Sequence, residues 1–177
     1  MKSSLRVCDD VSFRHERIHN ADMRRTDREV KDIDEIVSMI AGMDTIRIAM
    51  NAGEGPYIVP LSFGYEERSG MISFYMHSAL TGRKIDLIKA SSAAGFELDK
   101  ANGLVSGKEA CAFSMRYESV IGTGRISIVE DTAEKLHGMR KLMEHYTGRY
   151  DWDIPESALS HAAILRLEVL DISAKRY

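Results

Sequence analysis

The sequence has few cysteines, no long apolar run and no excess of basic charge. Its 177 residues include two cysteines, Cys8 and Cys111, which lie far apart and match no metal-ligand spacing, so we expect two reduced thiols in a cytoplasmic protein. No apolar stretch reaches membrane-spanning length, and the polar N-terminus does not look like a secretory signal. The formal net charge of −3 lacks the basic excess of general nucleic-acid binders. We therefore expect neither membranes nor nucleic acids among its partners.

The pattern of polar and apolar residues divides the chain into an arm and a folded part. Residues 1–22 are predicted to form a polar N-terminal arm, and 23–177 a single domain. Periodicity and turn residues predict strands over 44–50, 56–65, 71–77, 93–98, 110–129 and 163–172, helices starting near Asp32, Thr81 and Asp131, and irregular chain over 100–108 and 147–161. Because the strands follow one another through tight turns, they predict a mainly β, α+β fold: an antiparallel six-stranded barrel with peripheral helices.

The segment 58–84 carries the clearest indication of function. It is predicted to contain two strands and a loop that opens a helix with Arg83 and Lys84. Backbone N–H groups and basic side chains at a helix start bind phosphate, and Gly82 exposes such N–H groups. Thr81 or Ser78 supplies a hydroxyl. A solvated basic helix start is the plain alternative, but the Thr81-Gly82 lead-in favours a phosphate site.

Three further residues of this segment indicate what carries the phosphate. Pro60 cannot donate to a sheet ladder, and Gly64 allows another backbone or a flat ligand to approach closely. These features suggest a phosphorylated planar cofactor along a sheet edge, and flavin mononucleotide (FMN) fits that description. His77 ends the next strand, where it either caps the strand end or faces the ligand as a proton donor, since imidazole titrates near neutral pH.

Three short motifs resemble well-known sites but lack essential parts. Residues 15–19 match the zinc-protease pattern H-E-x-x-H, yet they lie in a charged, polar arm and no third ligand motif follows. Residues 103–108 are one residue short of a phosphate-binding Walker loop, and Glu109 stands where Ser or Thr must bind magnesium. The pair Gly122 and Gly124 is better explained by a bulge in a long strand than by a dinucleotide fingerprint. We expect no bound metal.

Several ordered motifs give the chain a family resemblance. They are MRRTDREV at 23–30, YIVPLSFGYE at 57–66, SFYMHSALTGRKIDLIK at 73–89, SMRYESVIGTGRI at 114–126 and KLMEHYTG at 141–148. With them the chain resembles the flavin-binding split-barrel superfamily typified by pyridoxamine-phosphate oxidase, and within it the NimA-type nitroimidazole-resistance proteins. The resemblance implies a split β-barrel, bound FMN, a homodimer with flavin sites at its interface, and reduction of the nitro group of 5-nitroimidazoles, which are small-molecule electron acceptors.

The resemblance also assigns roles to residues. A histidine at the position of His77 is thought to matter for the reaction in this family. The remaining assignments concern flavin binding. The isoalloxazine ring would lie beside Val59, Pro60, Leu61 and Ser62, with His77 and Ser78 near it. The phosphate would be held by Arg83 and Lys84, and the site would be completed by Arg116 and Ser119 from the partner subunit.

The end of the chain differs from the true pyridoxamine-phosphate oxidases. Those enzymes end in a basic substrate-binding segment with a terminal proline, whereas this chain ends LEVLDISAKRY, which argues against vitamin B6 oxidation. The main hypothesis is therefore a flavin-dependent oxidoreductase. The alternatives are a flavin or haem carrier or sensor without efficient turnover, and a pyridoxal-phosphate-binding relative. FAD remains an alternative to FMN because its adenylate would extend outside the visible motif.

Overall fold

The computed structural model describes residues 24–177, so the predictions for the arm and for the motif at 15–19 lie outside the described residues. Its elements in chain order are a 3-10 turn (Thr26–Arg28), β1 (Glu29–Val30), α1 (Ile33–Ala41), β2 (Ile46–Asn51), β3 (Pro56–Leu61), β4 (Phe63–Arg68), β5 (Met71–Ser78), α2 (Arg83–Ala90), β6 (Ala93–Val105), a 3-10 turn (Ala110–Ala112), β7 (Ser114–Ile128), α3 (Thr132–Thr147), α4 (Glu156–Ser160) and β8 (Ala163–Arg176). Within this part of the chain, no helix is long and apolar enough to cross a membrane.

The strands form one antiparallel sheet that curls on itself. Their order is β3-β2-β6-β7-β8-β5-β4, with β1 paired to β8. β3 and β4 lie at opposite ends of this order, although only Ser62 separates them in sequence. The sheet must therefore bend until its two ends meet at Ser62. Within residues 24–177 no ladder joins β3 to β4, so hydrogen bonds do not close the barrel there.

The structure confirms the mainly antiparallel α+β class and corrects the strand count. The sheet has eight strands instead of six, because the predicted strand 56–65 is divided at Ser62 and β1 adds a further short strand. The predicted loop 100–108 is wrong over 100–105, because β6 continues to Val105, paired with β7. The irregular stretch 147–161 contains α4. The bulge expected near Gly122 is confirmed, since the β7–β8 register shifts between Thr123 and Gly124.

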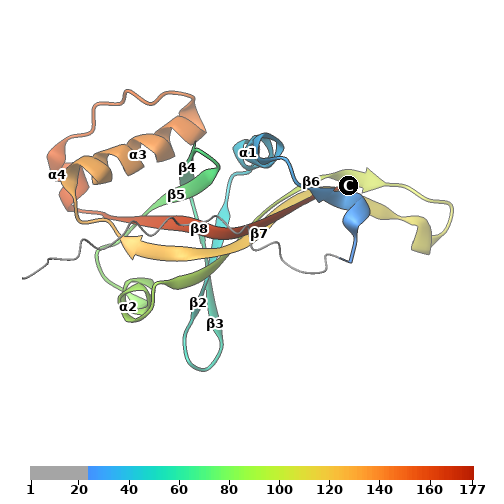
Figure 1. Ribbon diagram of the computed structural model, residues 1–177, viewed down its shortest axis with the longest axis horizontal. Coiled ribbons are helices and arrows are strands. Elements are labelled where there is room, and N and C mark those ends of the chain that lie inside the picture. Colours follow the sequence, from blue (N-terminus) through green and yellow to red (C-terminus); the bar gives the residue numbers. More distant parts are fainter. Residues whose placement is uncertain (1–23) are drawn as a thin grey trace, which may run out of the picture.

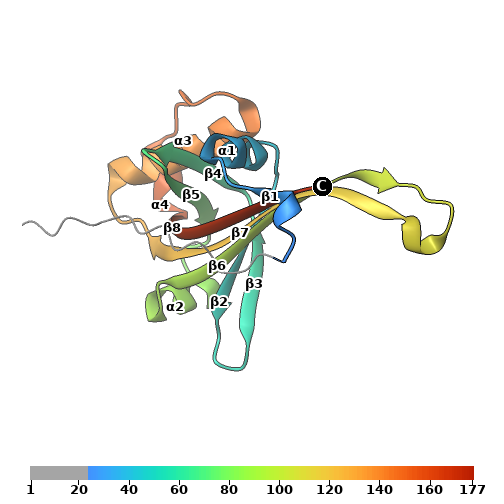
Figure 2. The same cartoon turned by 45° about the vertical axis from the view of Figure 1, so that its right-hand side comes forward.

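The helices cover the sheet from two sides. α1 and α3 lie along one side and α2 along the other, while the ends of β6 and β7 extend together as a long hairpin away from the body (Figures 1 and 2). We call this hairpin, residues 100–119, the β6–β7 arm. The main core contains the buried side chains of α1, α2 and the inner face of the sheet, including Ile40, Phe74, Ile85 and Leu98.

Glycine 64 explains how α3 reaches the sheet so closely. A Cβ at this position would lie 2.2 Å from the backbone carbon of Lys141 in α3. The sequence left open whether Gly64 admits another backbone or a flat ligand, and the structure shows that it admits the backbone of α3. Asp131 caps the start of α3 through the N–H of Glu134, and Gly148 ends the helix in the left-handed conformation.

A partly buried hydrogen-bond network holds α3 to β4. The Glu66 carboxylate accepts from His137 Nε2 at 2.9 Å and from the Tyr75 hydroxyl at 3.1 Å, and it pairs with Arg68 at 2.8 Å. Burial raises the pKa of Glu66, but hydrogen bonds from His137 and the Tyr75 hydroxyl and the charge of Arg68 hold this pKa below its usual value. Burial and the Glu66 charge raise the pKa of Tyr75, which remains a donor.

We expect Glu66→Gln to reduce the free energy of unfolding at pH 7 by about 1–3 kcal/mol, because hydrogen bonds to a charged group are lost. A lowered pKa in the folded state means that the ionised carboxylate stabilises the fold above its unfolded pKa. This contribution is lost as pH falls through the folded value. Urea unfolding at pH 7 and pH 3.5 should thus show a gap between variant and native protein that narrows in acid. Glu156→Gln, at an exposed site on α4, is the control, and a gap independent of pH would contradict this account.

Candidate functional site

The start of α2 forms an uncapped cluster of backbone donors. Gly82, the residue before the helix, has φ of 121°, a backbone conformation that residues other than glycine rarely adopt. No side chain of the described residues caps the helix, and the first N–H groups of any helix lack a partner within it. A residue with a Cβ would be strained here, although the space around Gly82 is open. The turn therefore leaves the N–H groups of α2 open to an anion.

Polar side chains around this turn also lack partners. Ser78, at the end of β5, is buried, and among residues 24–177 its Oγ has no hydrogen-bond partner. In the same part of the chain, neither Arg83 nor Lys84 forms an ion pair with a carboxylate. A buried hydroxyl without a partner is costly, and two unpaired cations beside free N–H groups form a donor set that fits a phosphate monoester.

A cation–π contact connects this turn to β3. The Arg83 guanidinium lies over the Tyr57 ring, 4.9 Å from its centroid. Among residues 24–177, β3 pairs only with β2, so in this part of the chain its other edge carries unpaired backbone groups. Val59, Pro60 and Leu61 belong to this edge strand, and Ser62 is the exposed residue at the corner that follows. The structure thus brings the predicted ring-binding strand and the predicted phosphate anchor close together.

The other predicted site residues fall into two groups. His77 is exposed near the end of β5, one residue before Ser78, and Thr81 is exposed in the loop before α2. Arg116 and Ser119 lie on β7, in the β6–β7 arm. Ala93, which begins β6 just after α2, pairs with Arg125 of β7. At roughly 3.3 Å per residue, the part of β7 between Arg116 and Arg125 is about 30 Å long. Within one chain, Arg116 therefore does not reach the start of α2.

Sequence reasoning missed a shallow hollow on the outer face of the sheet. It has a volume of about 410 Å³, and its lining includes Ile58 of β3, Gly95 of β6 and Ile121 and Thr123 of β7. Gly95 presents no side chain to the hollow, and a Cβ there would make only ordinary contact, 3.7 Å from its nearest neighbour. The exposed alternation of Ile58 and Pro60 along the edge strand was the available signal. Within 24–177, no group of three or more His, Cys, Asp or Glu side chains is placed to hold a metal ion.

Comparison with known proteins gives a consistent family. The sequence matches the family model described as pyridoxamine 5′-phosphate oxidase over residues 32–176. The fold is similar to that of a candidate 5-nitroimidazole antibiotic resistance protein from Bacteroides thetaiotaomicron, with TM-score 0.71, 28% identity, and 83% of this chain and 85% of that chain covered.

Two further solved structures share the fold at lower identity. The flavocytochrome Anf3 from Azotobacter vinelandii has TM-score 0.70 and 18% identity, over 87% of this chain and 71% of that chain. The FAD and haem binding protein from Mycobacterium smegmatis has TM-score 0.72 and 17% identity, over 84% and 73%. No curated protein matches the sequence.

Proposed function

Because the chain belongs to the pyridoxamine 5′-phosphate oxidase family, a family of flavin-binding, oxidoreductase-like proteins, we propose that it is a flavin-dependent oxidoreductase that binds FMN and reduces nitro compounds. The observation that carries the proposal is the open donor set at the start of α2. A phosphate there would receive N–H groups from α2, the cations of Arg83 and Lys84, and the Ser78 or Thr81 hydroxyl. The similarity to the candidate nitroimidazole resistance protein supports the choice of acceptor.

The residues near this anchor would orient the cofactor and supply a proton. A bound flavin takes up electrons from a donor and passes them to an acceptor. The free edge of β3, with Val59, Leu61 and Ser62, would hold the ring system through backbone groups and leave one of its faces accessible. His77 would hold a proton on a ring nitrogen beside the acceptor, since nitro reduction takes up protons as well as electrons.

We expect His77→Ala to slow reduction of a 5-nitroimidazole by at least about 10²-fold, the lower range for a lost general acid, with a much smaller effect on flavin affinity. The test mixes chemically reduced protein with the drug under anaerobic conditions, follows flavin reoxidation, and identifies the amine product. His161→Ala removes another exposed histidine, the residue that follows α4, and serves as the control. Normal turnover without His77 would remove it from the mechanism. Absence of amine product from the native protein would favour a flavin or haem carrier or sensor.

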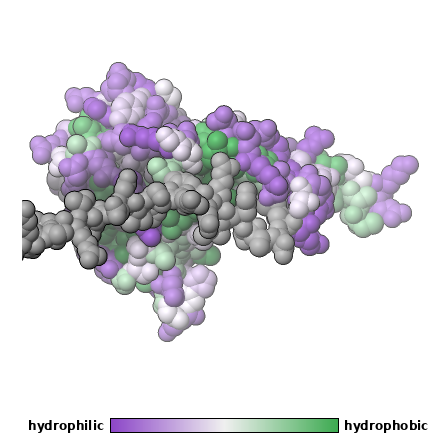
Figure 3. Space-filling model, in the orientation of Figure 1, coloured by the Kyte–Doolittle hydropathy of each residue, from purple (hydrophilic) through white to green (hydrophobic). Residues whose placement is uncertain are grey.

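We further propose that the protein acts as a homodimer. The β6–β7 arm exposes Leu104, Phe113 and Met115, and Leu104 and Met115 are cross-strand neighbours. Figure 3 shows hydrophobic surface on this arm, at the right of the view, among hydrophilic residues. An arm of this length with exposed apolar side chains is explained by a partner that covers it. In such a dimer Arg116 and Ser119 would complete the flavin site of the other subunit.

The dimer can be tested by mass. Light scattering at micromolar concentration should give twice the chain mass for the flavin-loaded protein. Leu104→Glu combined with Met115→Glu should give the mass of one chain, because two charges cannot be buried without partners. The matched control is Met71→Glu, at the exposed apolar residue that begins β5. A flavin-loaded native protein with the mass of one chain would contradict the dimer.

A further inference from the structure

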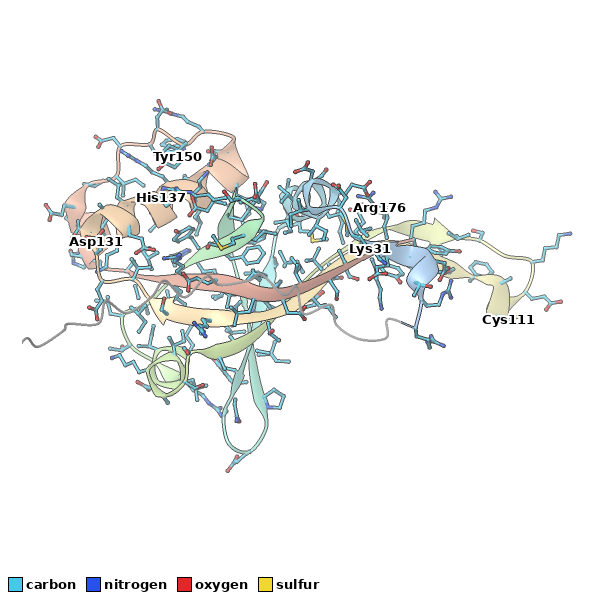
Figure 4. The ribbon with its side chains drawn as sticks, in the orientation of Figure 1. Lys31, Cys111, Asp131, His137, Tyr150 and Arg176 are labelled. Carbon is cyan, nitrogen blue, oxygen red and sulfur yellow. The ribbon has the colours of Figure 1, made fainter. Side chains whose placement is uncertain are left out.

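A second cavity lies on the opposite side of the sheet from α2. It has a volume of about 720 Å³ and is lined by residues of α1, β4 and α3 and by Tyr150 from the segment after α3. Figure 4 shows His137 and Tyr150 together on the α3 side of the molecule. The size is typical of small-molecule sites, and the proposed flavin site uses none of its lining residues.

Hydrogen bonding at one end of the cavity determines which groups there can accept a hydrogen bond from a ligand. Glu66 is a carboxylate and only accepts, so His137 Nε2 must carry the proton that it donates over 2.9 Å. In the neutral ring, Nδ1 then accepts from the Tyr150 hydroxyl at 2.8 Å. Because its proton is committed to His137, the Tyr150 oxygen offers only lone pairs to the cavity. Glu66 itself is already occupied by Tyr75, His137 and Arg68.

The same reasoning applies to the other end. His145 Nε2 lies 2.8 Å from the Met43 carbonyl, which only accepts, so the proton is on Nε2 and Nδ1 of the neutral ring is an acceptor. Within the described part of the chain, Nδ1 of His145 and the hydroxyl of Tyr65 have no hydrogen-bond partner. Tyr65 and His145 pack edge to face with ring centroids 5.6 Å apart, which gives this end an aromatic wall.

The charges of the lining add a further preference. Three carboxylates, Glu66, Glu67 and Glu144, face two cations, Arg68 and Lys141. Arg68 pairs with Glu66, and Lys141 donates to Glu144 Oε2 at 2.7 Å. Within residues 24–177, Oε1 of Glu144 and Oε2 of Glu67 receive no hydrogen bond from another side chain. With neutral imidazoles, the unused groups are thus mostly acceptors and the net charge is negative.

We infer that this cavity is a second small-molecule site and that it binds an organic ammonium with a compact apolar body. The ammonium donates to Glu144, to the oxygen of the Tyr65 hydroxyl and to the lone pairs of Tyr150 or His145. The body packs against Val37, Ala41 and the Tyr65 ring. A ligand that carries a carboxylate would be repelled by the carboxylate oxygens of Glu67 and Glu144. A neutral alcohol has one proton to donate, so it would leave most of the acceptors in the cavity without a hydrogen bond.

The test is calorimetric titration of the flavin-loaded protein with three probes of one shape. Phenethylammonium should bind, with a dissociation constant at or below the millimolar range, while 2-phenylethanol should bind at least tenfold more weakly and phenylacetate not at all. Glu144→Gln should weaken phenethylammonium binding about tenfold or more, and Tyr65→Phe severalfold, with the flavin absorbance unchanged. Glu156→Gln, which also removes one negative charge, should bind as the native protein does.

Three results would overturn the inference. They are no heat of binding with phenethylammonium at millimolar concentration, equal binding of all three probes, and native affinity in both Glu144→Gln and Tyr65→Phe. If Glu144→Gln fails to fold, Tyr65→Phe alone decides, because it removes only a hydroxyl that has no hydrogen-bond partner within residues 24–177. Flavin content is measured in the same samples, so failure of this site and failure of the flavin proposal are separate outcomes.

Discussion

Replacing Arg83 and Lys84 together with alanine should weaken FMN binding by at least about 10²-fold and leave the fold intact. Charge-assisted hydrogen bonds to phosphate are worth roughly 1.5–3 kcal/mol each, and about 1.4 kcal/mol corresponds to a factor of ten. Neither side chain is held in an ion pair within the described residues, so both are available to the phosphate and their removal breaks no such pair in that part of the fold. The measurement is a fluorescence titration of flavin-free protein with FMN.

A matched double variant separates this effect from a general loss of positive charge. Lys31→Ala with Lys89→Ala removes the same charge at two exposed positions, one before α1 and one in the last turn of α2. It should bind FMN with nearly native affinity. Riboflavin, which lacks the phosphate, should bind the native protein and the Arg83/Lys84 variant alike. Unchanged FMN affinity in the Arg83/Lys84 variant would place the phosphate elsewhere.

Gly64→Ala should be the most destabilising single methyl addition on the sheet under α3. The new Cβ would lie 2.2 Å from the Lys141 backbone carbon and 2.3 Å from the Leu142 nitrogen. Backbone atoms of a helix cannot turn away as a flexible side chain can, so α3 must move off β4. The Glu66–His137 network would then be strained as well. We expect a loss of at least about 3 kcal/mol, the upper range for overpacking, and a fall in Tm of roughly 6–12 °C.

Thermal unfolding followed by circular dichroism measures this effect, with Gly42→Ala as the control. Gly42 ends α1 with φ of −92°, and a Cβ there would lie 3.5 Å from its nearest neighbour, an ordinary contact. That variant should unfold within about 0.5 kcal/mol of the native protein. A Gly64→Ala protein with native stability would show that β4 and α3 are not packed as described.

The sequence was most informative where a feature depends on local chemistry. The Asp32 and Asp131 caps, the turn at Gly82 and the basic start of α2 follow from the residues themselves. The division of one predicted strand at Ser62 could not be predicted, because it depends on how far the whole sheet curls. The continuation of β6 to Val105 was missed, since Lys100 and Gly103 are typical of a loop and only their pairing with β7 makes this segment a strand.

The candidate sites differ in the same way. The phosphate anchor lies within one short segment, so its residues could be named from their order along the chain. The second cavity combines Glu66, His137 and Tyr150, which are far apart in sequence and are brought together only when α3 packs on β4 at Gly64. No periodicity or motif marks such a combination in advance.

Flavin binding is the central claim, and the visible absorbance spectrum of the purified protein tests it most directly. The account predicts a yellow protein whose flavin is released on denaturation, carries a phosphate when identified by chromatography, and is stoichiometric with the chain. It also predicts that a flavin-free preparation regains the spectrum when FMN is added. A colourless protein that takes up neither FMN nor FAD would contradict the account.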